Sequence, residues 1–282
     1  MKRPGKLSVI AVHAGLAAAV AITLYPVAMV IKKSIEPGKN FALSASPIPH
    51  AVTLDHFREL LSTRASSGEL LFLRNALNSA VVAVAATVIG LALATSAAYA
   101  LSRFRFRGRD VSLGSFVVVQ MFPATLLLMP LYVLLNRLGL LGSLFGLVLV
   151  YATTAIPFCV WTLKGYFDSL PVAIEDAARI DGASAWGVFY RIALPLARPG
   201  LAVTALFSFM TAWNEFILAS VFMTDERAYT LPVLLNSAVG EHAADWGLFA
   251  AGALLTSVPV MALFYALQRH LVGGITAGGV KG

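Results

Sequence analysis

The sequence predicts an all-α, polytopic membrane protein with six transmembrane helices, and three observations lead to that fold class. Of its 282 residues, 59% are hydrophobic and 12% are charged, whereas soluble globular domains contain about 25% charged residues. Six apolar runs are each long enough to cross a bilayer, which takes about 20 residues of α-helix. The basic residues cluster beside these runs, as is usual for segments that flank membrane spans.

The six expected spans cover most of the chain. They are Leu7–Ile31, Ala76–Leu101, Val111–Leu135, Leu138–Leu163, Leu201–Met223 and Trp246–Leu267. Only the fifth contains a charged residue, Glu215. Four prolines within the spans are expected to kink their helices. They are Pro123, Pro130, Pro157 and Pro259. Gly142 and Gly146 have the spacing of a close-packing motif between spans.

The first run could be confused with a secretory signal because Lys2, Arg3 and Lys6 precede it. Its apolar length exceeds the ~7–15 residues of a signal core. Lys32 and Lys33 follow it, rather than small residues suited to cleavage. We therefore expect it to be retained as the first span.

Basic residues also predict the orientation. The run RFRFRGR, residues 103–109, separates the second and third spans and indicates the cytoplasmic side. With this segment inside, both termini and the segment between the fourth and fifth spans are expected to be cytoplasmic as well. The expected location is the bacterial cytoplasmic (inner) membrane.

Several function classes are disfavoured by composition. The formal net charge is +7, but the positive charge flanks apolar runs, so we expect no nucleic-acid partner. The single cysteine, Cys159, lies inside an apolar run and is expected to be a small buried residue. The five histidines show no metal-ligand spacing. No nucleophile set and no phosphate-binding loop of the G-x-x-x-x-G-K-[ST] type is present, so the chain is expected not to be an enzyme.

The segment EDAARIDGASAWGVFYRIALPLARPG, residues 175–200, interrupts this apolar chain with a predicted helix–turn–helix. On a helical wheel Glu175, Asp176 and Arg179 fall on one arc, which we expect to face outward, and Glu175 and Arg179 have the favourable i,i+4 spacing. The central contact residues, Ala177 and Ala178, are small and allow a partner to approach closely.

Local residues predict the ends of these two helices. Pro171 suits the first turn, with Asp168 or Ser169 as the capping residue. Gly182 suits the left-handed position that ends the first helix. Ser184 can cap a second helix over about residues 186–194. The second helix is expected to end at the prolines that follow. They are Pro195 and Pro199.

The pattern E-D-A-A-x-x-D-G-A at residues 175–183, followed by Leu194-Pro195 and by Pro199, resembles the EAA signature of permease subunits of ABC importers. This resemblance implies the type I importer transmembrane fold, with a coupling helix at about residues 169–194 that docks into a cleft on a cytoplasmic ATPase. The residues to which it assigns that role are Glu175, Ala177, Ala178, Asp181, Gly182, Ala183 and Pro195. Asp176 stands where the signature often has alanine.

Two further segments look like the smaller, MalG-type subunit of maltose importers. They are TAWNEF, residues 211–216, and the glycine-rich tail QRHLVGGITAGGVKG, residues 268–282. The likeness implies that Gly278, Gly279 and Lys281 contact the ATPase, whereas composition alone also fits a frayed terminus. The expected organisation is a first span and outer loop (1–75), a permease core (76–271) and a cytoplasmic tail (272–282).

The function implied by the resemblance is import of maltose, maltodextrin or a related glucoside by alternating access. The implied partners are a larger permease subunit, two copies of an ATPase subunit that bind ATP and magnesium, an extracytoplasmic solute-binding protein and the lipid bilayer. The chain itself is expected to bind no cofactor. Trehalose or glycerol phosphate are alternative solutes, and a self-contained secondary transporter is the alternative from another class.

Glu215 and Asn214 are the candidates for the translocation path, because a carboxylate within a span is functional by default. A structural or gating role for Glu215, through a hydrogen bond to a neighbouring span, is the alternative. A secondary transporter would need coupling residues inside the membrane, and only Glu215 is available for that purpose.

Overall fold

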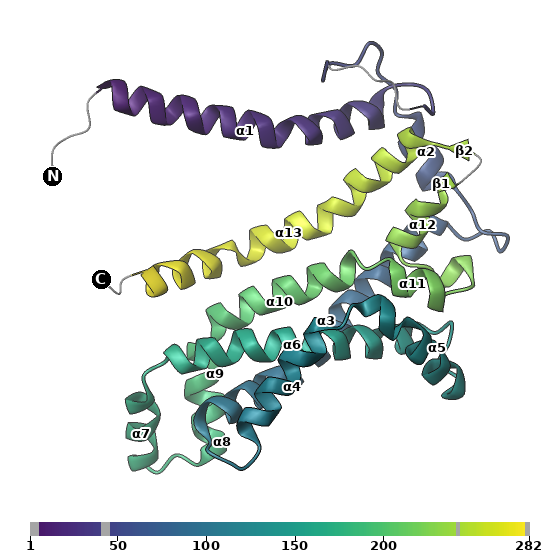
Figure 1. Ribbon diagram of the computed structural model, residues 1–282. Helices are drawn as coiled ribbons and strands as arrows, with labels where there is room; N and C mark the ends of the chain where they lie inside the picture. Colours follow the sequence, from purple (N-terminus) through teal and green to yellow (C-terminus); the bar gives the residue numbers. More distant parts are fainter. Residues whose placement is uncertain (1–5, 41–45, 241–242, 280–282) are drawn as a thin grey trace. The chain divides into compact units, whose positions relative to one another are not determined.

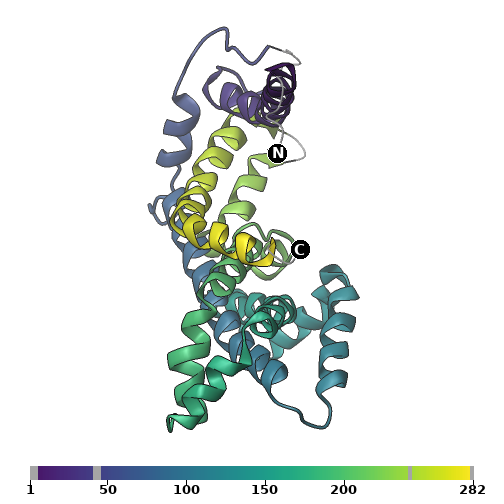
Figure 2. The same ribbon diagram turned by 90° about the vertical axis from the view of Figure 1, so that its left-hand side faces the viewer.

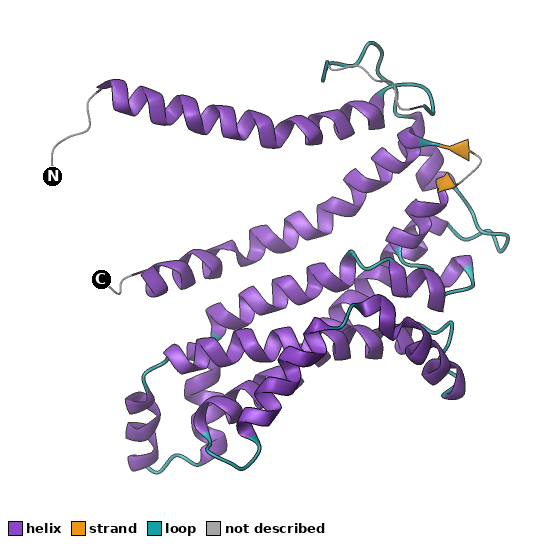
Figure 3. Cartoon of the chain, viewed as in Figure 1, coloured by secondary structure: helices purple, strands orange, loops and turns teal. Residues whose placement is uncertain are grey.

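The computed structural model describes residues 6–40, 46–240 and 243–279 (Figure 1). Helices dominate the described chain, and one short strand pair joins them (Figure 3). The chain divides into two compact units. Unit 1 contains Met1–Leu73 and Leu234–Val258, and unit 2 contains Arg74–Val233 and Pro259–Gly282.

Unit 1 consists mainly of the amino-terminal helix and the segment that precedes the last span. Its elements are α1 (Lys6–Ile35), α2 (Asp55–Ser62), most of α12 (Leu231–Ser237), the strands β1 (Val239–Gly240) and β2 (Ala243–Ala244), and the first part of α13 (Trp246–Gly279). The strands pair antiparallel, with Val239 opposite Ala244. The Trp246 amide donates to the Lys39 carbonyl over 2.9 Å, which fixes the start of α13 to the segment after α1.

Unit 2 holds most of the spans and the segment of functional interest. Its elements are α3 (Leu71–Arg103, which begins in unit 1), α4 (Arg109–Met121), η1 (Ala124–Leu127), α5 (Leu128–Arg137), α6 (Leu144–Ser169), α7 (Val172–Ile180), α8 (Ala185–Val188), the π-helical η2 (Phe189–Ala193), α9 (Leu194–Leu196), α10 (Arg198–Trp213), α11 (Ile217–Phe222) and η3 (Glu226–Ala228). Within this unit α6 packs against α10 and α4 (Figures 1 and 2).

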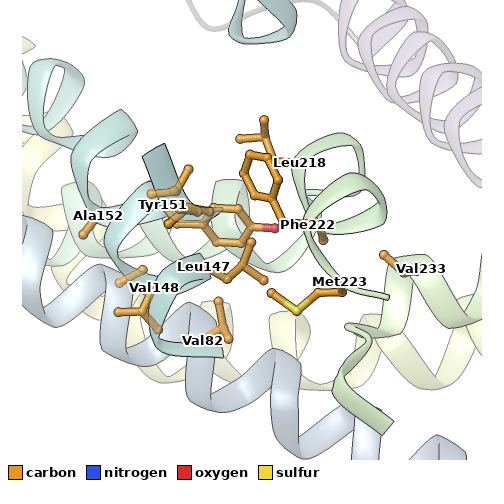
Figure 4. Close-up of a cluster of buried hydrophobic side chains, with 13 residues drawn as sticks. Val82, Leu147, Val148, Tyr151, Ala152, Leu218, Phe222, Met223 and Val233 are labelled. Carbon is orange, nitrogen blue, oxygen red and sulfur yellow. The ribbon is translucent and has the colours of Figure 1, made fainter. Parts of the chain in front are cut away.

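Two clusters of buried side chains hold unit 2 together. The first joins α3, α6 and α11 through residues such as Val82, Tyr151 and Phe222 (Figure 4). The second joins the end of α3 to α6 and η2 and contains Tyr99 and Cys159. Cys159 is fully buried as a small residue, as predicted. Because lipid tails are as apolar as these side chains, such clusters stabilise a bundle of membrane helices through close packing and not through the removal of apolar surface from water.

Among the described residues, four helices are long and apolar enough to span a membrane, and the number rises to six if each of two bent helix pairs forms one span. The four are Ser8–Ile35, Leu71–Arg103, Leu144–Ser169 and Trp246–Gln268. They match the first, second, fourth and sixth predicted spans to within a few residues at most ends. The bent pairs are Arg109–Met121 with Thr125–Arg137, and Ala185–Leu196 with Arg198–Trp213.

The third predicted span was wrong as a continuous helix. It bends by 91° between α4 and the helix that follows. Phe122 adopts an extended backbone, because a residue before proline avoids the helical region and Pro123 lacks a backbone donor. Pro157 and Pro259, in contrast, lie inside unbroken helices.

The predicted start of the fourth span was also wrong, because α6 begins at Leu144. Gly139 and Gly142 have positive φ angles of 67° and 76° and form a turn before the helix. Ser143 caps the helix by accepting from the Gly146 amide over 3.0 Å. Gly142 and Gly146 thus belong to a turn and a helix start, and the Gly142 amide also donates to the Phe222 carbonyl at the end of α11 over 3.0 Å.

The fifth predicted span is interrupted as well. α10 ends at Trp213, and α11 begins only at Ile217. The three residues between them include both candidates for the translocation path, Asn214 and Glu215. The interruption therefore places these polar residues at the junction of two helices instead of within one.

Candidate functional site

The turn after α7 has the geometry that the sequence predicted. Gly182 has a φ of 86°, in the left-handed region that glycine adopts without strain. Its amide donates to the Arg179 carbonyl over 3.1 Å, and the Ala183 amide donates to the Ala178 carbonyl over 2.9 Å. These two bonds are the Schellman arrangement of a helix end, so the position of Gly182 fixes where α7 stops.

The cap of the next helix is confirmed as well. The Ser184 hydroxyl accepts a hydrogen bond from the Gly187 amide over 3.2 Å, which satisfies one of the free donors at the start of α8. A side-chain cap of this kind contributes about 1 kcal/mol. Gly182 and Ser184 together define a tight reversal between α7 and α8.

The predicted cap at the start of α7 was wrong. Pro171 occupies the capping position, and no side chain caps the helix. Asp168 instead accepts hydrogen bonds from Ser102 and Lys164, each over 2.6 Å. The Ser169 hydroxyl donates to the Tyr166 carbonyl over 2.7 Å. α7 begins later than expected, at Val172. Asp168 and Ser169 therefore lie in the last turn of α6 instead.

Glu175 does not face outward as predicted, because it is 99% buried. Its carboxylate accepts a hydrogen bond from Arg103 Nε over 2.8 Å and another from the Tyr99 hydroxyl over 2.9 Å. The predicted i,i+4 pair with Arg179 is present at 3.4 Å. A buried carboxylate needs this number of partners to offset the loss of hydration.

Arg103 makes further hydrogen bonds that extend this network. Its Nη1 donates to the Ser102 hydroxyl over 3.0 Å, and its Nη2 donates to the Leu170 carbonyl over 3.3 Å. Because Ser102 also donates to Asp168, the ends of α3 and α6 and the middle of α7 share one polar network. Sequence reasoning missed Arg103 and Tyr99 as site residues. The available signal was the position of Arg103 as the first arginine after an apolar span.

The exposed surface of α7 is mainly apolar. Ile180 is 86% exposed, and Val172, Ile174 and Ala177 are exposed as well. Asp176 is exposed and pairs with Arg179 at 2.5 Å. Glu175 therefore attaches α7 to the rest of unit 2, while small and aliphatic side chains on the other faces of the helix stay exposed.

Of the remaining predicted site residues on this segment, Ala178 is half-buried, whereas Asp181 and Gly182 are exposed. Asp181 is the C-cap residue of α7, and its amide donates to the Ala177 carbonyl over 3.0 Å. Ala183 is half-buried in the turn.

The second helix ends at Leu196, between the two prolines that were expected to end it, and Pro195 itself lies inside the last turn. The helix passes through π-helical η2 into α9, which contains Pro195. In a regular α-helix proline has no N–H to donate to the carbonyl four residues earlier, and its ring clashes with that carbonyl. The wider π-helical turn before Pro195 avoids both problems. The chain bends by 73° between this helix and α10, where Pro199 occupies the first turn.

Two exposed aromatic residues lie on the surface of the second helix. Trp186 and Tyr190 stack with their ring centroids 5.7 Å apart. A hollow of about 500 Å³ extends from Gly182 past Trp186 to Arg191. Exposed aromatic and arginine side chains are the residue types that contribute most to protein interfaces, so the turn and this hollow form one potential contact surface.

Glu215 is engaged in structural hydrogen bonds. Its carboxylate accepts from the Leu218 amide over 2.8 Å and from the Ala219 amide over 3.1 Å, and it also accepts from the Tyr151 hydroxyl. It thus caps the first turn of α11 and ties it to α6. Asn214 is exposed, and its side chain donates to the Met210 carbonyl over 2.9 Å. The bond from Tyr151 on α6 is the hydrogen bond to a neighbouring span that a structural role for Glu215 was expected to involve.

The tail residues lie at the limit of the structure. The backbone of α13 is helical through Gly278 and Gly279, and Lys281 lies outside the described residues. The contact of this tail with an ATPase stays a prediction.

Comparison with known proteins identifies the family. Residues 86–276 match the family described as "Binding-protein-dependent transport system inner membrane component". The chain belongs to this family. As a member, it is a multi-pass permease component of the inner membrane and not an enzyme, as the sequence predicted.

Curated relatives of this permease align over nearly their full length. A galactooligosaccharide transport system permease protein of Bacillus subtilis, GanQ, is 39% identical over 95% of this chain and 93% of the relative. The maltose/maltodextrin transport system permease protein MalG of Salmonella typhimurium is 39% identical over 98% of this chain and 97% of the relative. MalG of Yersinia pestis is 36% identical over 98% and 95%, respectively.

The fold of the permease is that of an ABC importer transmembrane domain. A chain of a bacterial ABC transporter involved in the import of the polysaccharide alginate superposes with a TM-score of 0.78 at 23% identity, over 96% of this chain and 100% of that chain. The predicted type I importer fold is thereby confirmed.

Proposed function

We propose that this permease is the smaller of two membrane subunits of an ATP-driven importer for maltose, maltodextrin or a related glucoside. Support for the substrate class comes from the relatives, since two maltose/maltodextrin permeases (MalG) and one galactooligosaccharide permease (GanQ) are 36–39% identical to this chain. Trehalose and glycerol phosphate are the less favoured solutes, because the relatives described above are named as permeases for maltose/maltodextrin and galactooligosaccharides.

The coupling mechanism is supported by the difference between the two faces of α7, of which one is buried and the other exposed. Glu175 anchors the helix to α3 through Arg103, whereas Ile180 and its aliphatic neighbours are exposed. We assign α7 to a cleft on a partner ATPase, with Ala177, Ala178 and Ala183 allowing close approach. Glu175, Asp181, Gly182 and Pro195 then set the shape of the segment rather than its contact chemistry.

Coupling follows from this attachment. When two ATPase subunits close on ATP and magnesium, a docked α7 moves with them, and its polar network moves the end of α3. The membrane helices then pass between two arrangements, which is a coupling of two sites through a two-state element. This role requires the α7 side of the chain, and with it both termini, to be cytoplasmic. Gly278, Gly279 and Lys281 are proposed as a further contact with the ATPase.

The remaining proposed partners follow from the same assembly. A larger permease subunit completes the pathway, and an extracytoplasmic binding protein delivers the sugar. The family description itself names a binding-protein-dependent system. The bilayer surrounds the spans.

A self-contained secondary transporter is the less favoured alternative. It needs a carboxylate that exchanges ions within the membrane. The carboxylate of Glu215 is occupied by two backbone amides and by the Tyr151 hydroxyl, so its bonding is that of a helix cap. Asn214 and Glu215 accordingly remain proposed path residues only through their position at the junction of α10 and α11.

The coupling proposal is tested at Gly182. A Cβ atom at this position meets nothing within 4 Å, so a substitution acts through the backbone alone. Gly182→Val is expected to distort the turn because a β-branched residue disfavours positive φ, whereas Gly182→Asn tolerates that conformation. Retention of the ATPase during purification and ATP-driven uptake of labelled maltose are the two measurements.

We expect Gly182→Val to lose both properties and Gly182→Asn to keep most of them. Uptake that continues without any ATPase would overturn the coupling proposal and favour the secondary transporter. Uptake of galactooligosaccharide in place of maltose, with ATPase binding intact, would overturn only the substrate assignment.

A further inference from the structure

The arginine-rich loop between α3 and α4 contains two kinds of arginine. Arg103 is bound to Glu175, and Arg109 Nε donates to the Leu101 carbonyl over 2.7 Å. Arg105 and Arg107 are exposed, and neither has a hydrogen-bond or ion-pair partner in the described part of the chain. Arg103 and Arg109, at the two ends of the loop, therefore hold it in place. Arg105 and Arg107, between them, carry free positive charge.

Two phenylalanines alternate with the free arginines. Phe104 and Phe106 are each 48% exposed. In a soluble loop such apolar exposure beside charge would be costly, but at a membrane surface aromatic and basic side chains are both favoured. The loop follows directly after Arg103, the last residue of a helix long enough to span the bilayer, so it lies where that span reaches the headgroups.

An apolar groove begins at the same place. It measures about 310 Å³ and is lined by Ser96, Tyr99, Ala100, Phe104, Trp186 and Phe189, together with Ala185. No charged side chain lines it. Tyr99 packs on Phe104 and on Phe189, with ring centroids 6.2 Å and 4.8 Å apart. The last two turns of α3 thus form one wall, and α8 with η2 forms the other.

We propose that this groove and loop bind one anionic phospholipid of the inner leaflet. Its acyl chain occupies the groove between α3 and α8, and its phosphate pairs with Arg105 and Arg107. Charge complementarity selects this occupant, because an apolar groove ending at unpaired arginines matches a molecule with a hydrocarbon tail and an anionic head. The hollow beside Gly182 and Arg191 differs, since its wall includes charged and polar groups and suits a protein partner.

A bound lipid at this position would contact both walls of the groove. Trp186 and Phe189 follow the turn at Gly182, and Tyr99 hydrogen-bonds to Glu175. Lipid occupancy would thereby stabilise the packing of the second helix against α3. The proposal does not depend on which sugar is imported.

The test uses the whole transporter, purified with its partner subunits into nanodiscs that contain equal amounts of phosphatidylglycerol and phosphatidylcholine. Native mass spectrometry then measures how much of each lipid stays bound after release from the disc. The charge variant is Arg105→Gln with Arg107→Gln. Its matched control is Arg74→Gln with Arg137→Gln, which removes two exposed arginines elsewhere.

We expect the unaltered complex and the matched control to retain phosphatidylglycerol at least threefold over phosphatidylcholine, and the charge variant to lose this preference. Ala100→Trp fills the groove and is expected to reduce retention of both lipids. Ala92→Trp, on an exposed part of the same helix, should leave retention unchanged.

Equal retention of phosphatidylglycerol by the charge variant and its control would overturn the proposal. Loss of the ATPase from the charge variant with lipid retention unchanged would also overturn it, because the surface would then belong to the ATPase interface. If Gly182→Val releases the ATPase while the lipid preference persists, the coupling assignment and the lipid site are shown to be independent.

Discussion

Arg103 Nε donates to Glu175 Oε1 over 2.8 Å, although 72 residues separate the two in sequence. The two side chains are 7% and 2% exposed. Their pairing joins the last residue of the long span α3 to the middle of α7. The proposed coupling would use this pairing to transmit a displacement of α7 to α3.

Substitution of Glu175 by Gln should weaken this connection strongly. The change removes the negative charge and leaves Arg103 buried without its counter-ion, and breaking a buried ion pair from one side costs about 3–5 kcal/mol. We expect a lower midpoint of thermal unfolding for the reconstituted complex and fewer sugars imported per ATP hydrolysed. Both quantities can be measured in the same proteoliposome preparation.

Asp176→Asn is the matched control for that experiment. Asp176 lies next to Glu175 and pairs with Arg179. The side chains of Asp176 and Arg179 are 59% and 39% exposed, and such surface pairs contribute about 0–1 kcal/mol. Equal losses of stability in Glu175→Gln and Asp176→Asn would contradict the buried connection.

Rules that depend on neighbouring residues predicted much of this protein. Apolar runs identified the four unbroken spans, and glycine and serine at the right spacing identified the turn at Gly182 and the cap at Ser184. Each of these features is determined by one contiguous stretch of the chain. Their physical causes, namely positive φ, capping and the length of a membrane span, can be recognised without knowledge of the tertiary structure.

Features that depend on distant residues were not predicted. The helical wheel placed Glu175 and Arg179 on one face, but it could not show that Tyr99 and Arg103 cover Glu175. At the interruption of residues 214–216, Glu215 bonds to the start of α11 and also to the distant Tyr151 on α6, and an apolar run of normal length gave no sign of this arrangement. Gly90 likewise packs closely against α6, since a Cβ atom added to it would lie 3.3 Å from the Ala152 carbonyl oxygen. No local sequence pattern indicates this contact.

Glu215→Gln should destabilise the junction of α10 and α11. Both carboxylate oxygens accept hydrogen bonds from the amides of Leu218 and Ala219, and an amide side chain offers only one acceptor atom. A buried donor left unpaired costs about 1–3 kcal/mol. We expect a lower unfolding midpoint, with the KM for sugar little changed in the protein that remains folded.

Asn214→Ala provides the comparison, because Asn214 is exposed and its side chain bonds to the preceding turn of α10. It should change stability by less than about 0.5 kcal/mol. An increased KM for Glu215→Gln at unaltered stability would instead assign this carboxylate to sugar contact.

Asn78→Leu should loosen the loop that precedes α12. The Asn78 side chain donates to the carbonyls of Arg227 and Tyr229 over 2.8 and 3.0 Å, and it is 4% exposed. Loss of both bonds leaves two acceptors without this donor, at about 1–3 kcal/mol for each that stays buried. Faster amide hydrogen exchange at residues 229–233 would report the loosening, and Asn136→Leu, at an exposed position, should leave that exchange unchanged.

Gly200→Ala should disturb the contact between α10 and α6. An added Cβ would lie 2.5 Å from Tyr166 Cγ, an atom near the backbone that cannot move away without shifting the ring. Overpacking of this kind costs about 1–3 kcal/mol, so the unfolding midpoint should fall. Gly165→Ala is the control on α6, since a Cβ there meets nothing within 4 Å and alanine favours a helix over glycine by about 1 kcal/mol. Because Gly200 follows the 73° bend that leads from the second helix into α10, a fall in stability with normal ATPase binding would locate the damage in the membrane part, whereas loss of ATPase binding would show that this contact also sets the orientation of α7.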